Sequence, residues 1–196
     1  MNVHSIFPTL FTDERLKIDN NSLLEYATAM RDQQDTDRAG GWQSAWLDLT
    51  ASELAPLVSE VQAHLDKLSR EVYTFPDHLT IKLANGWFNF NDPGVEQLNN
   101  NYYHLHGGFF TSTVYYIDVE HNSGNLVLIP PHSFLDYALP FQLVQQMNQF
   151  TAQRFHVLPE TGKLVSFPSW INHFAEPNRS NSTRVCVAFN GVIDER

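Results

Sequence analysis

Two histidines one residue apart precede a run of strand-forming residues. His104 and His106 lie in the segment NYYHLHGGFFTSTVYY, at positions 101–116. In an extended strand, residues i and i+2 project to the same face, so the two imidazoles can close on one metal ion. The same spacing also suits two polar residues on the solvent-facing side of a strand. The pair alone therefore leaves a metal site and a surface strand both open.

Two residues later in the chain could complete such a site. His173 ends the segment PSWINH, just past an expected strand at 163–167, and Arg184 opens an apolar run. A buried strand rarely carries an arginine unless an anion pairs with it, and a guanidinium binds a carboxylate through two parallel hydrogen bonds. Non-haem Fe(II) oxygenases hold iron with two histidines and one carboxylate and keep other positions open. Here the third candidate ligand is another histidine.

The first 75 residues predict the layer that supports this site. An extended strand is expected in the first ten residues, followed by helices over 20–31 and 52–73. Apolar residues at spacings of three and four indicate the second helix. Thr50 to Glu53 predict a capping box at its start.

Residues 76–196 predict the β core. Short runs rich in Val, Phe, Tyr and Thr alternate with turns that contain Gly, Pro or Asn. The segment 133–149 is ambiguous between a loop and a short helix broken by Pro140. We therefore expect a single domain over 1–196 that is mainly β with supporting N-terminal helices (α+β), its antiparallel strands forming a sandwich or a jelly roll.

Composition narrows the classes of partner. Of 196 residues, 22 are acidic and 12 are basic, which gives a formal net charge of −10. This balance repels phosphate backbones, so nucleic acid is not an expected partner. We recognise no signal peptide and no apolar stretch long enough to span a membrane, which predicts a cytoplasmic protein. Cys186, the single cysteine, excludes an intrachain disulfide and is expected to be a small buried hydrophobe.

Two blocks of the sequence resemble a known family. The H-x-H…S-x-VYY block spans 104–116, and an FPSW-x-x-H…P-N…R-x-x-x-AFN block spans 167–190. Weaker matches are FPT at 7–9, GWQS at 41–44 and W-x-N at 87–89. Together they make the chain similar to the 2-oxoglutarate/Fe(II)-dependent oxygenases found in bacteria and marine phages, which are related to the prolyl-hydroxylase branch of that superfamily.

The resemblance implies a role for each candidate residue. His104, His106 and His173 would hold Fe(II), with His173 as the distal histidine. Arg184, about ten residues beyond it, would bind the distal carboxylate of the cosubstrate 2-oxoglutarate, and Tyr116 would donate its hydroxyl to the same carboxylate. The implied fold is a double-stranded β-helix, and the implied reaction hydroxylates a C–H bond of a peptide (prolyl-like) or small-molecule substrate while 2-oxoglutarate becomes succinate and carbon dioxide.

Roles are also expected for residues near these candidates. Strand alternation places Tyr116 and Tyr115 on opposite faces. Asn89 is assigned to the cosubstrate side of the barrel, whereas Trp87 is favoured as a core residue. Trp170 is expected to pack at the barrel mouth and to shield the metal. The cytoplasm of a bacterium or of a phage-infected host is the expected location, and aromatic N-terminal segments could pair two subunits into a homodimer.

One departure from the superfamily pattern concerns the third ligand. The first two ligands usually form an H-x-D/E pair, and here His106 stands where the carboxylate is expected. Three neutral imidazoles would leave bound Fe(II) with a higher net charge. Asp118 or Glu120, on or near the following strand, could supply a carboxylate instead.

Two rival functions follow from that departure. A cupin-type dioxygenase uses three histidines without 2-oxoglutarate, but a cupin expects a glutamate a few residues after H-x-H, and Arg184 would have no purpose in it. A non-catalytic binding module with a degenerate metal site is the second rival. Release of succinate from 2-oxoglutarate would support the oxygenase, because neither rival function produces it.

Overall fold

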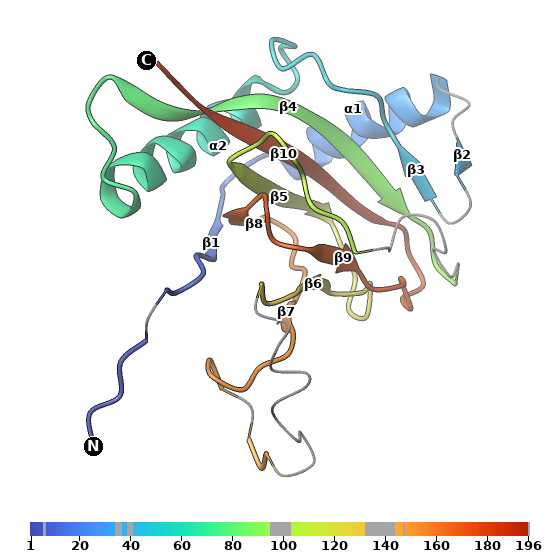
Figure 1. Cartoon of the computed structure of the whole chain (residues 1–196). Coiled ribbons are helices and arrows are strands. Elements are labelled where there is room, and N and C mark those ends of the chain that lie inside the picture. Colours follow the sequence, from blue (N-terminus) through green and yellow to red (C-terminus); the bar gives the residue numbers. More distant parts are fainter. Residues whose placement is uncertain are drawn as a thin grey trace.

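The computed structural model describes residues 1–5, 7–33, 41–94, 103–131, 144–146 and 148–195, together with the backbone of 37–38. Most of the ambiguous segment 133–149 lies outside these ranges. The elements in the described ranges, in chain order (Figure 1), are β1 (Thr12–Arg15), α1 (Asn20–Gln33), β2 (Asp37–Arg38), β3 (Gly41–Gln43), α2 (Ala55–Lys67), the π-helical turn η1 (Leu68–Val72), β4 (Leu79–Asn91), β5 (Thr111–Asp118), β6 (Leu126–Leu128), β7 (Phe155–Val157), β8 (Lys163–Pro168), β9 (His173–Ala175) and β10 (Arg184–Glu195).

The strands of the described ranges form two sheets, and each pair of neighbours is antiparallel. The larger sheet has seven strands in the order β1-β8-β5-β10-β4-β3-β2, and the smaller has three in the order β7-β6-β9. In Figure 1 both helices lie on one side of the larger sheet, and the smaller sheet lies on the other side. This confirms the predicted mainly β, α+β fold.

Side chains of the larger sheet alternate between its two faces. The β10 residues that join the helices in one hydrophobic core are Val185, Val187 and Phe189. The β10 residues that alternate with them and line a pocket facing the smaller sheet are Arg184, Cys186, Ala188 and Asn190. Because of this period-two alternation, the apolar positions of β10 pack against the helices, and the alternate positions place functional groups in the pocket.

The predicted start of the second helix is wrong. α2 begins at Ala55, with Pro56 in its first turn and no side-chain cap. Proline suits that position because its fixed φ fits a helix and its missing N–H has no intrahelical partner there. Thr50 does not form the expected capping box with Glu53; its N–H (2.9 Å) and its hydroxyl (2.6 Å) both donate to the Asp48 carboxylate. The helical segment ends with η1 at Val72, close to the predicted end.

The N-terminal strand lies later than predicted. Among the described residues of the first ten, none is in a strand, and β1 begins at Thr12. It pairs with β8 so that Arg15 lies opposite Lys163. An apolar sequence such as the one before β1 does not define a strand by itself; a neighbouring strand with free backbone groups must also be present.

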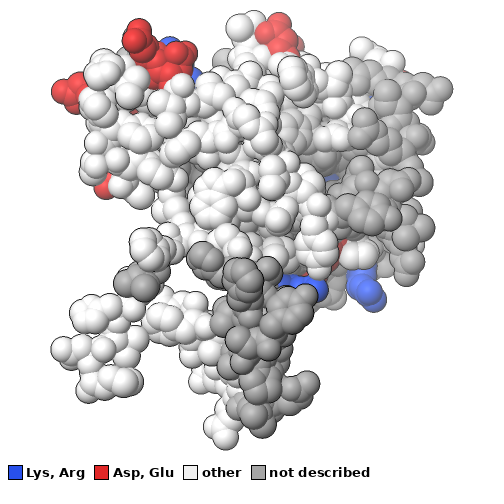
Figure 2. All heavy atoms as spheres, in the orientation of Figure 1, with Lys and Arg blue, Asp and Glu red and all other residues white. Residues whose placement is uncertain are grey.

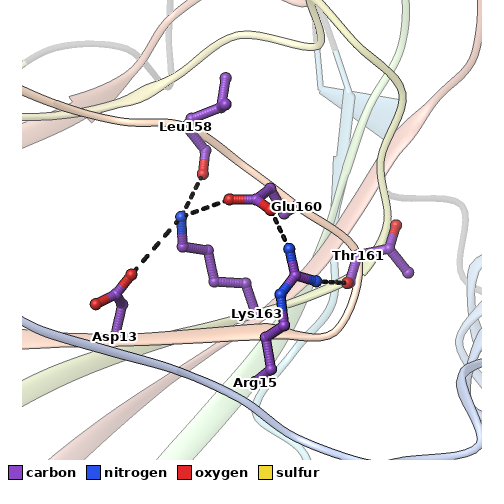
Figure 3. A network of polar contacts seen from close by, with 6 residues as sticks. All are labelled: Asp13, Arg15, Leu158, Glu160, Thr161 and Lys163. Carbon is purple, nitrogen blue, oxygen red and sulfur yellow. Dashed lines mark hydrogen bonds and ion pairs between the residues drawn. The ribbon is translucent and has the colours of Figure 1, made fainter.

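A network of polar contacts holds β1 on β8 (Figure 3). Lys163 Nζ donates to the Leu158 carbonyl oxygen (3.1 Å) and to the Glu160 carboxylate (2.9 Å). The same ammonium group lies 3.8 Å from the Asp13 carboxylate, and Arg15 pairs with Glu160. Since exposed ion pairs contribute about 0–1 kcal/mol each, the network mainly fixes the position of β1.

Charged side chains lie at the margins of the face shown in Figure 2. Acidic groups gather along its upper edge, and the middle of the face is uncharged wherever its residues are described. No helix in the described part of the chain is long and apolar enough to cross a lipid bilayer.

Candidate metal centre and anion pocket

Two neighbouring histidines and a third from a distant part of the chain lie close together. One ring nitrogen from each of His104, His106 and His173 lies within 4.8 Å of the others. The ring centroids are separated by 4.3 Å between His104 and His173, 5.1 Å between His106 and His173, and 5.2 Å between His104 and His106. Nitrogen donors at this spacing can share one divalent cation.

Backbone hydrogen bonds bring these residues together. The His104 N–H donates to the His173 carbonyl (3.2 Å), and the His173 N–H donates to the His104 carbonyl (2.9 Å). This antiparallel bridge extends the edge of the smaller sheet beyond β9. The His106 N–H donates to the Ser169 carbonyl (2.9 Å), which holds the second histidine of the pair as well.

Hydrogen bonds at Nδ1 orient two of the rings. His173 Nδ1 donates to the Ile171 carbonyl (2.8 Å), and His106 Nδ1 lies 2.6 Å from Asn190 Oδ1. A ring that carries its proton on Nδ1 keeps the Nε2 lone pair for a metal. Both rings are therefore oriented as metal-binding histidines usually are.

Burial favours the neutral form of His106 and His173. Burial lowers the pKa of His173 to about 3, an effect that the Ile171 carbonyl opposes and that the nearby His104 and His106 reinforce. Burial also lowers the pKa of His106, against the opposing hydrogen bond to Asn190. A neutral imidazole is the form that binds a metal, so this environment favours metal binding at neutral pH.

A carboxylate does not join the three nitrogens within the described residues. The group of possible metal ligands contains His104, His106 and His173 alone. Asp118 is exposed at the end of β5, and the Glu120 carboxylate accepts hydrogen bonds from Asn181 and Ser182 in another loop. Neither acid is a member of this group, and the third residue that lies close to His104 and His173 is His106.

The histidines open into a pocket of about 650 Å³ between the two sheets. Its walls come mainly from the inward-facing positions of β4, β5 and β10, which supply amide, hydroxyl and guanidinium groups. The pocket-lining residues of these strands that carry polar side chains are Trp87, Asn89, Asn91, Ser112, Thr113, Tyr116, Arg184, Cys186 and Asn190.

Arg184 is a buried cation with neutral hydrogen-bond partners. Its side chain lines the pocket, and the residue is 3% exposed. Nε and Nη2 donate to Asn91 Oδ1 (3.1 and 2.9 Å), while Nη1 donates to the carbonyls of Ser123 (2.9 Å) and Gly124 (2.7 Å). In the described part of the chain, no carboxylate forms an ion pair with it. Burying a charge without a counter-ion costs desolvation free energy, and an anion bound in the pocket would offset that cost.

Tyr116 lies beside Arg184 and stays protonated. Burial raises the pKa of its hydroxyl; the Cys186 thiol reinforces the effect and the Arg184 charge opposes it. The neighbouring Tyr115 points to the opposite face, where its hydroxyl donates to Asn20 Oδ1 of α1 (2.7 Å). The predicted alternation of the two tyrosines is thereby confirmed, and Tyr116 is available as a neutral hydrogen-bond donor in the pocket.

The backbone conformation of Gly124 allows its carbonyl to accept a hydrogen bond from Arg184. The substitution Gly124→Ala is expected to disturb that conformation. The residue has φ +88°, and a Cβ there would overlap the carbonyl oxygens of Glu176 and Pro177. We expect the free energy of unfolding in urea to fall by about 2 kcal/mol or more. Gly94→Ala is a matched control, because Gly94 also has positive φ (+72°) but no atom within 4 Å of its Cβ position. Equal losses in the two variants would contradict the steric part of this account.

The tryptophans and Asn89 differ in their relation to the pocket. Asn89 and Trp87 line it, so Trp87 is not the core residue that the sequence favoured; its ring lies 5.4 Å from the His106 ring. Trp170 is 51% exposed and is not among the lining residues, which contradicts the predicted shielding role. Trp46, 74% exposed, does line the pocket and therefore stands at its solvent edge.

Two amide groups position the site, and sequence reasoning missed the first of them, Asn91. Asn91 holds the Arg184 guanidinium, and Asn190 holds the His106 ring. A signal for Asn91 was present in the W-x-N-x-N alternation of residues 87–91, because asparagine is disfavoured in strands and rarely buried without a partner. Its partner, however, lies 93 residues away.

The sequence also matches a known family. Residues 86–190 match the family model described as "Putative 2OG-Fe(II) oxygenase", just over half of the chain. The chain belongs to this family. It is therefore an enzyme of the 2OG-Fe(II) oxygenase class, whose cofactor is Fe(II) and whose cosubstrate is 2-oxoglutarate. Among curated proteins, no sequence matches the chain.

Solved structures of 2OG oxygenases share the fold. A prolyl hydroxylase from Trichoplax adhaerens, solved with a hypoxia-inducible factor peptide, has a TM-score of 0.61 at 14% identity, covering 93% of this chain and 83% of that chain. The epimerase SnoN, solved with Fe³⁺, α-ketoglutarate and nogalamycin RO, has a TM-score of 0.61 at 13% identity (96% and 82%). A prolyl-4-hydroxylase from Pseudomonas putida has a TM-score of 0.55 at 12% identity (94% and 92%). The double-stranded β-helix fold of the 2OG oxygenase is thereby confirmed.

The residues of the site fit the cofactor and the cosubstrate of the family. Three imidazoles are suitable ligands for Fe(II). The buried Arg184, with neutral partners in the same pocket, fits a dicarboxylate such as 2-oxoglutarate. The family match thus favours the oxygenase over the cupin and over the non-catalytic module.

Proposed function

We propose that the enzyme hydroxylates a C–H bond of a peptide or small molecule, using Fe(II) held by His104, His106 and His173. The observation that carries the proposal is that three imidazole donors lie within 4.8 Å of one another in a pocket that also holds a buried arginine. Both halves of an Fe(II)/2-oxoglutarate site are then present in one cavity.

Arg184 and Tyr116 are the proposed binding groups for the distal carboxylate of 2-oxoglutarate. The guanidinium is already held by Asn91 and by two loop carbonyls, so little side-chain entropy is lost when an anion binds. The Tyr116 hydroxyl adds a neutral donor beside it. Asn89, on the same wall, is the proposed polar contact on the cosubstrate side.

Bound Fe(II) supplies the redox chemistry that couples oxidation of 2-oxoglutarate by dioxygen, to succinate and carbon dioxide, with hydroxylation of the substrate. The chain itself orients the cosubstrate through Arg184 and favours the neutral form of the His106 and His173 imidazoles through burial. It also holds the ring orientations through the Nδ1 hydrogen bonds. These contributions are positioning effects, which decide which C–H bond is within reach.

Succinate formation tests the proposal. The purified protein is incubated with Fe(II), ascorbate and ¹⁴C-labelled 2-oxoglutarate, and labelled succinate is measured with and without candidate substrates. We expect 2-oxoglutarate turnover that requires Fe(II) and stops with a chelator. Oxygen consumption that is independent of 2-oxoglutarate would contradict the proposal and support the cupin alternative.

The lining of the pocket favours a neutral peptide unit over a free amino acid. The described lining residues include no Asp or Glu, so a substrate ammonium group would lack a counter-ion there. Trp46 at the solvent edge offers an aromatic surface, and Gln43 beside it offers an amide. Aromatic faces and amides are well suited to peptide bonds and to proline rings. A proline-containing peptide is therefore the proposed substrate class.

Trp46→Ala is expected to weaken peptide binding selectively. With a proline-rich peptide as probe, the KM for the peptide should rise by about 5- to 10-fold, the effect of one aromatic contact of about 1 kcal/mol. The KM for 2-oxoglutarate should not change. Trp170→Ala is the matched control, because Trp170 is exposed but does not line the pocket. Hydroxylation of free L-proline, detected as a gain of one oxygen by mass spectrometry, without hydroxylation of the peptide would contradict the peptide assignment.

A further inference from the structure

A chain of three buried polar side chains lies behind His106. Asn190 on β10 is opposite Asn85 on β4 and opposite Ser112 on β5. It is therefore the middle residue of a row that crosses three adjacent strands. All three residues are buried. Such a row of polar groups inside a sheet costs free energy unless each group is hydrogen-bonded.

The hydrogen bonds in this row fix the orientation of the Asn190 amide. Its Nδ2 group donates to Asn85 Oδ1 (3.0 Å), and its Oδ1 accepts from the Ser112 hydroxyl (3.4 Å). The oxygen therefore faces His106, whose Nδ1 lies 2.6 Å away. Because an amide oxygen can only accept, His106 must carry its proton on Nδ1, which leaves the Nε2 lone pair free for a metal.

The backbone at this point is also fixed. The register of β10 against β4 shifts between Asn190 and Gly191, which marks a β-bulge. Gly191 is packed so closely that a Cβ would lie 2.7 Å from the Ile81 side chain, and its carbonyl accepts from the Phe110 N–H (2.8 Å). The extra residue of this irregularity, Ala84, lies on β4, so Asn190 keeps the period-two alternation of β10 that also places Arg184, Cys186 and Ala188 in the pocket.

We propose that Asn190 is the positioning residue that makes a histidine usable as the third metal ligand. Asn85 and Ser112 keep its amide oxygen toward His106, and that oxygen selects the Nδ1-protonated tautomer. A reversed amide would present Nδ2–H to the ring, force the proton to Nε2 and remove the lone pair from the metal. The inference rests on the proposed role of His106 as a ligand, and it adds the origin of the tautomer.

The tautomer can be measured in the metal-free protein. In protein labelled with ¹⁵N-histidine, two-bond ¹H–¹⁵N correlation spectra distinguish Nδ1–H from Nε2–H for each ring. The wild type should show His106 as the Nδ1–H form. In Asn190→Ala and Asn190→Leu, which remove the acceptor, we expect a mixture of tautomers or the Nε2–H form. A wild-type His106 in the Nε2–H form would overturn the inference, even if no variant could be purified.

Metal affinity provides the second readout. Co(II) is the probe, because its visible spectrum reports the ligand set and can be followed without oxygen chemistry. Loss of a hydrogen bond that orients a ligand typically lowers metal affinity by about 10- to 100-fold, and we expect this for Asn190→Ala. Asn190→Asp keeps an acceptor at the same place and should bind Co(II) at least ten times more tightly than Asn190→Ala does. Asn172→Ala, at an exposed asparagine beside His173, should match the wild type.

These outcomes separate the inference from the proposed function. If Asn190→Ala keeps both the wild-type tautomer and the wild-type Co(II) affinity, the positioning role is wrong, whatever the protein catalyses. If the tautomer and affinity change as expected but 2-oxoglutarate is not turned over, the positioning role stands and the catalytic proposal fails.

Discussion

Replacing Arg184 by glutamine is expected to raise the KM for 2-oxoglutarate by at least about 100-fold while metal affinity changes little. A hydrogen bond to a charged group contributes about 1.5–3 kcal/mol, and 2.7 kcal/mol corresponds to about 100-fold in affinity. The guanidinium is the cation proposed to meet the distal carboxylate, and it lines the same pocket as the three histidines. Its removal should therefore affect cosubstrate binding and leave the histidines in place. Succinate release as a function of 2-oxoglutarate concentration measures the effect.

Arg184→Lys should recover only part of that loss. An ammonium group keeps the charge but cannot bridge Asn91 and the carbonyls of Ser123 and Gly124 as the guanidinium does. Arg179→Gln is the control, because Arg179 is exposed and lies outside this pocket. Because both Arg184 variants leave buried acceptors without a donor, thermal unfolding must show that they are folded at the assay temperature. A folded Arg184→Gln protein with the wild-type KM would show that 2-oxoglutarate binds elsewhere.

The parts of this site that the sequence predicts are those governed by strand periodicity. His104 and His106 share a face because they are two residues apart. Tyr116 faces the pocket and Tyr115 the helices for the same reason. Arg184 is the polar start of an otherwise apolar strand, and it is buried there with no carboxylate partner among the described residues, as the proposed anion-binding role requires. Local alternation suffices for each of these assignments.

Other parts depend on contacts between distant segments. The pairing of His104 with His173 is an isolated bridge between segments far apart in the sequence, and β9 itself was not predicted. The hydrogen bond from His106 to Asn190 spans 84 residues and depends on the register of three strands. Pro56 overrides a well-formed capping-box pattern at the start of α2. In each case a tertiary contact or a backbone restriction, and not the local pattern, determines the result.

Removal of His106 is expected to lower the affinity for Fe(II) or Co(II) by at least about 100-fold, on the order of 3 kcal/mol. His106→Ala deletes one of three nitrogen donors, and the remaining pair lacks a described carboxylate that could replace it. Anaerobic titration against a chromophoric chelator measures the affinity. His121→Ala is the control, since His121 is exposed and is not a member of the cluster. Wild-type affinity in His106→Ala would mean that the third ligand comes from another residue.

His106→Asp shows whether charge or geometry limits this site. The substitution introduces the carboxylate that the H-x-D/E pattern contains, and charge alone would predict tighter metal binding. The side chain is shorter than histidine, however, and its carboxylate would face the acceptor oxygen of Asn190, which Asn85 and Ser112 hold in place. We therefore expect His106→Asp to bind Co(II) more tightly than His106→Ala but more weakly than the wild type. Affinity above the wild-type value would show that the charge of the ligand outweighs the hydrogen bonds behind it, and that the amide row of β4, β5 and β10 is not adapted to an imidazole.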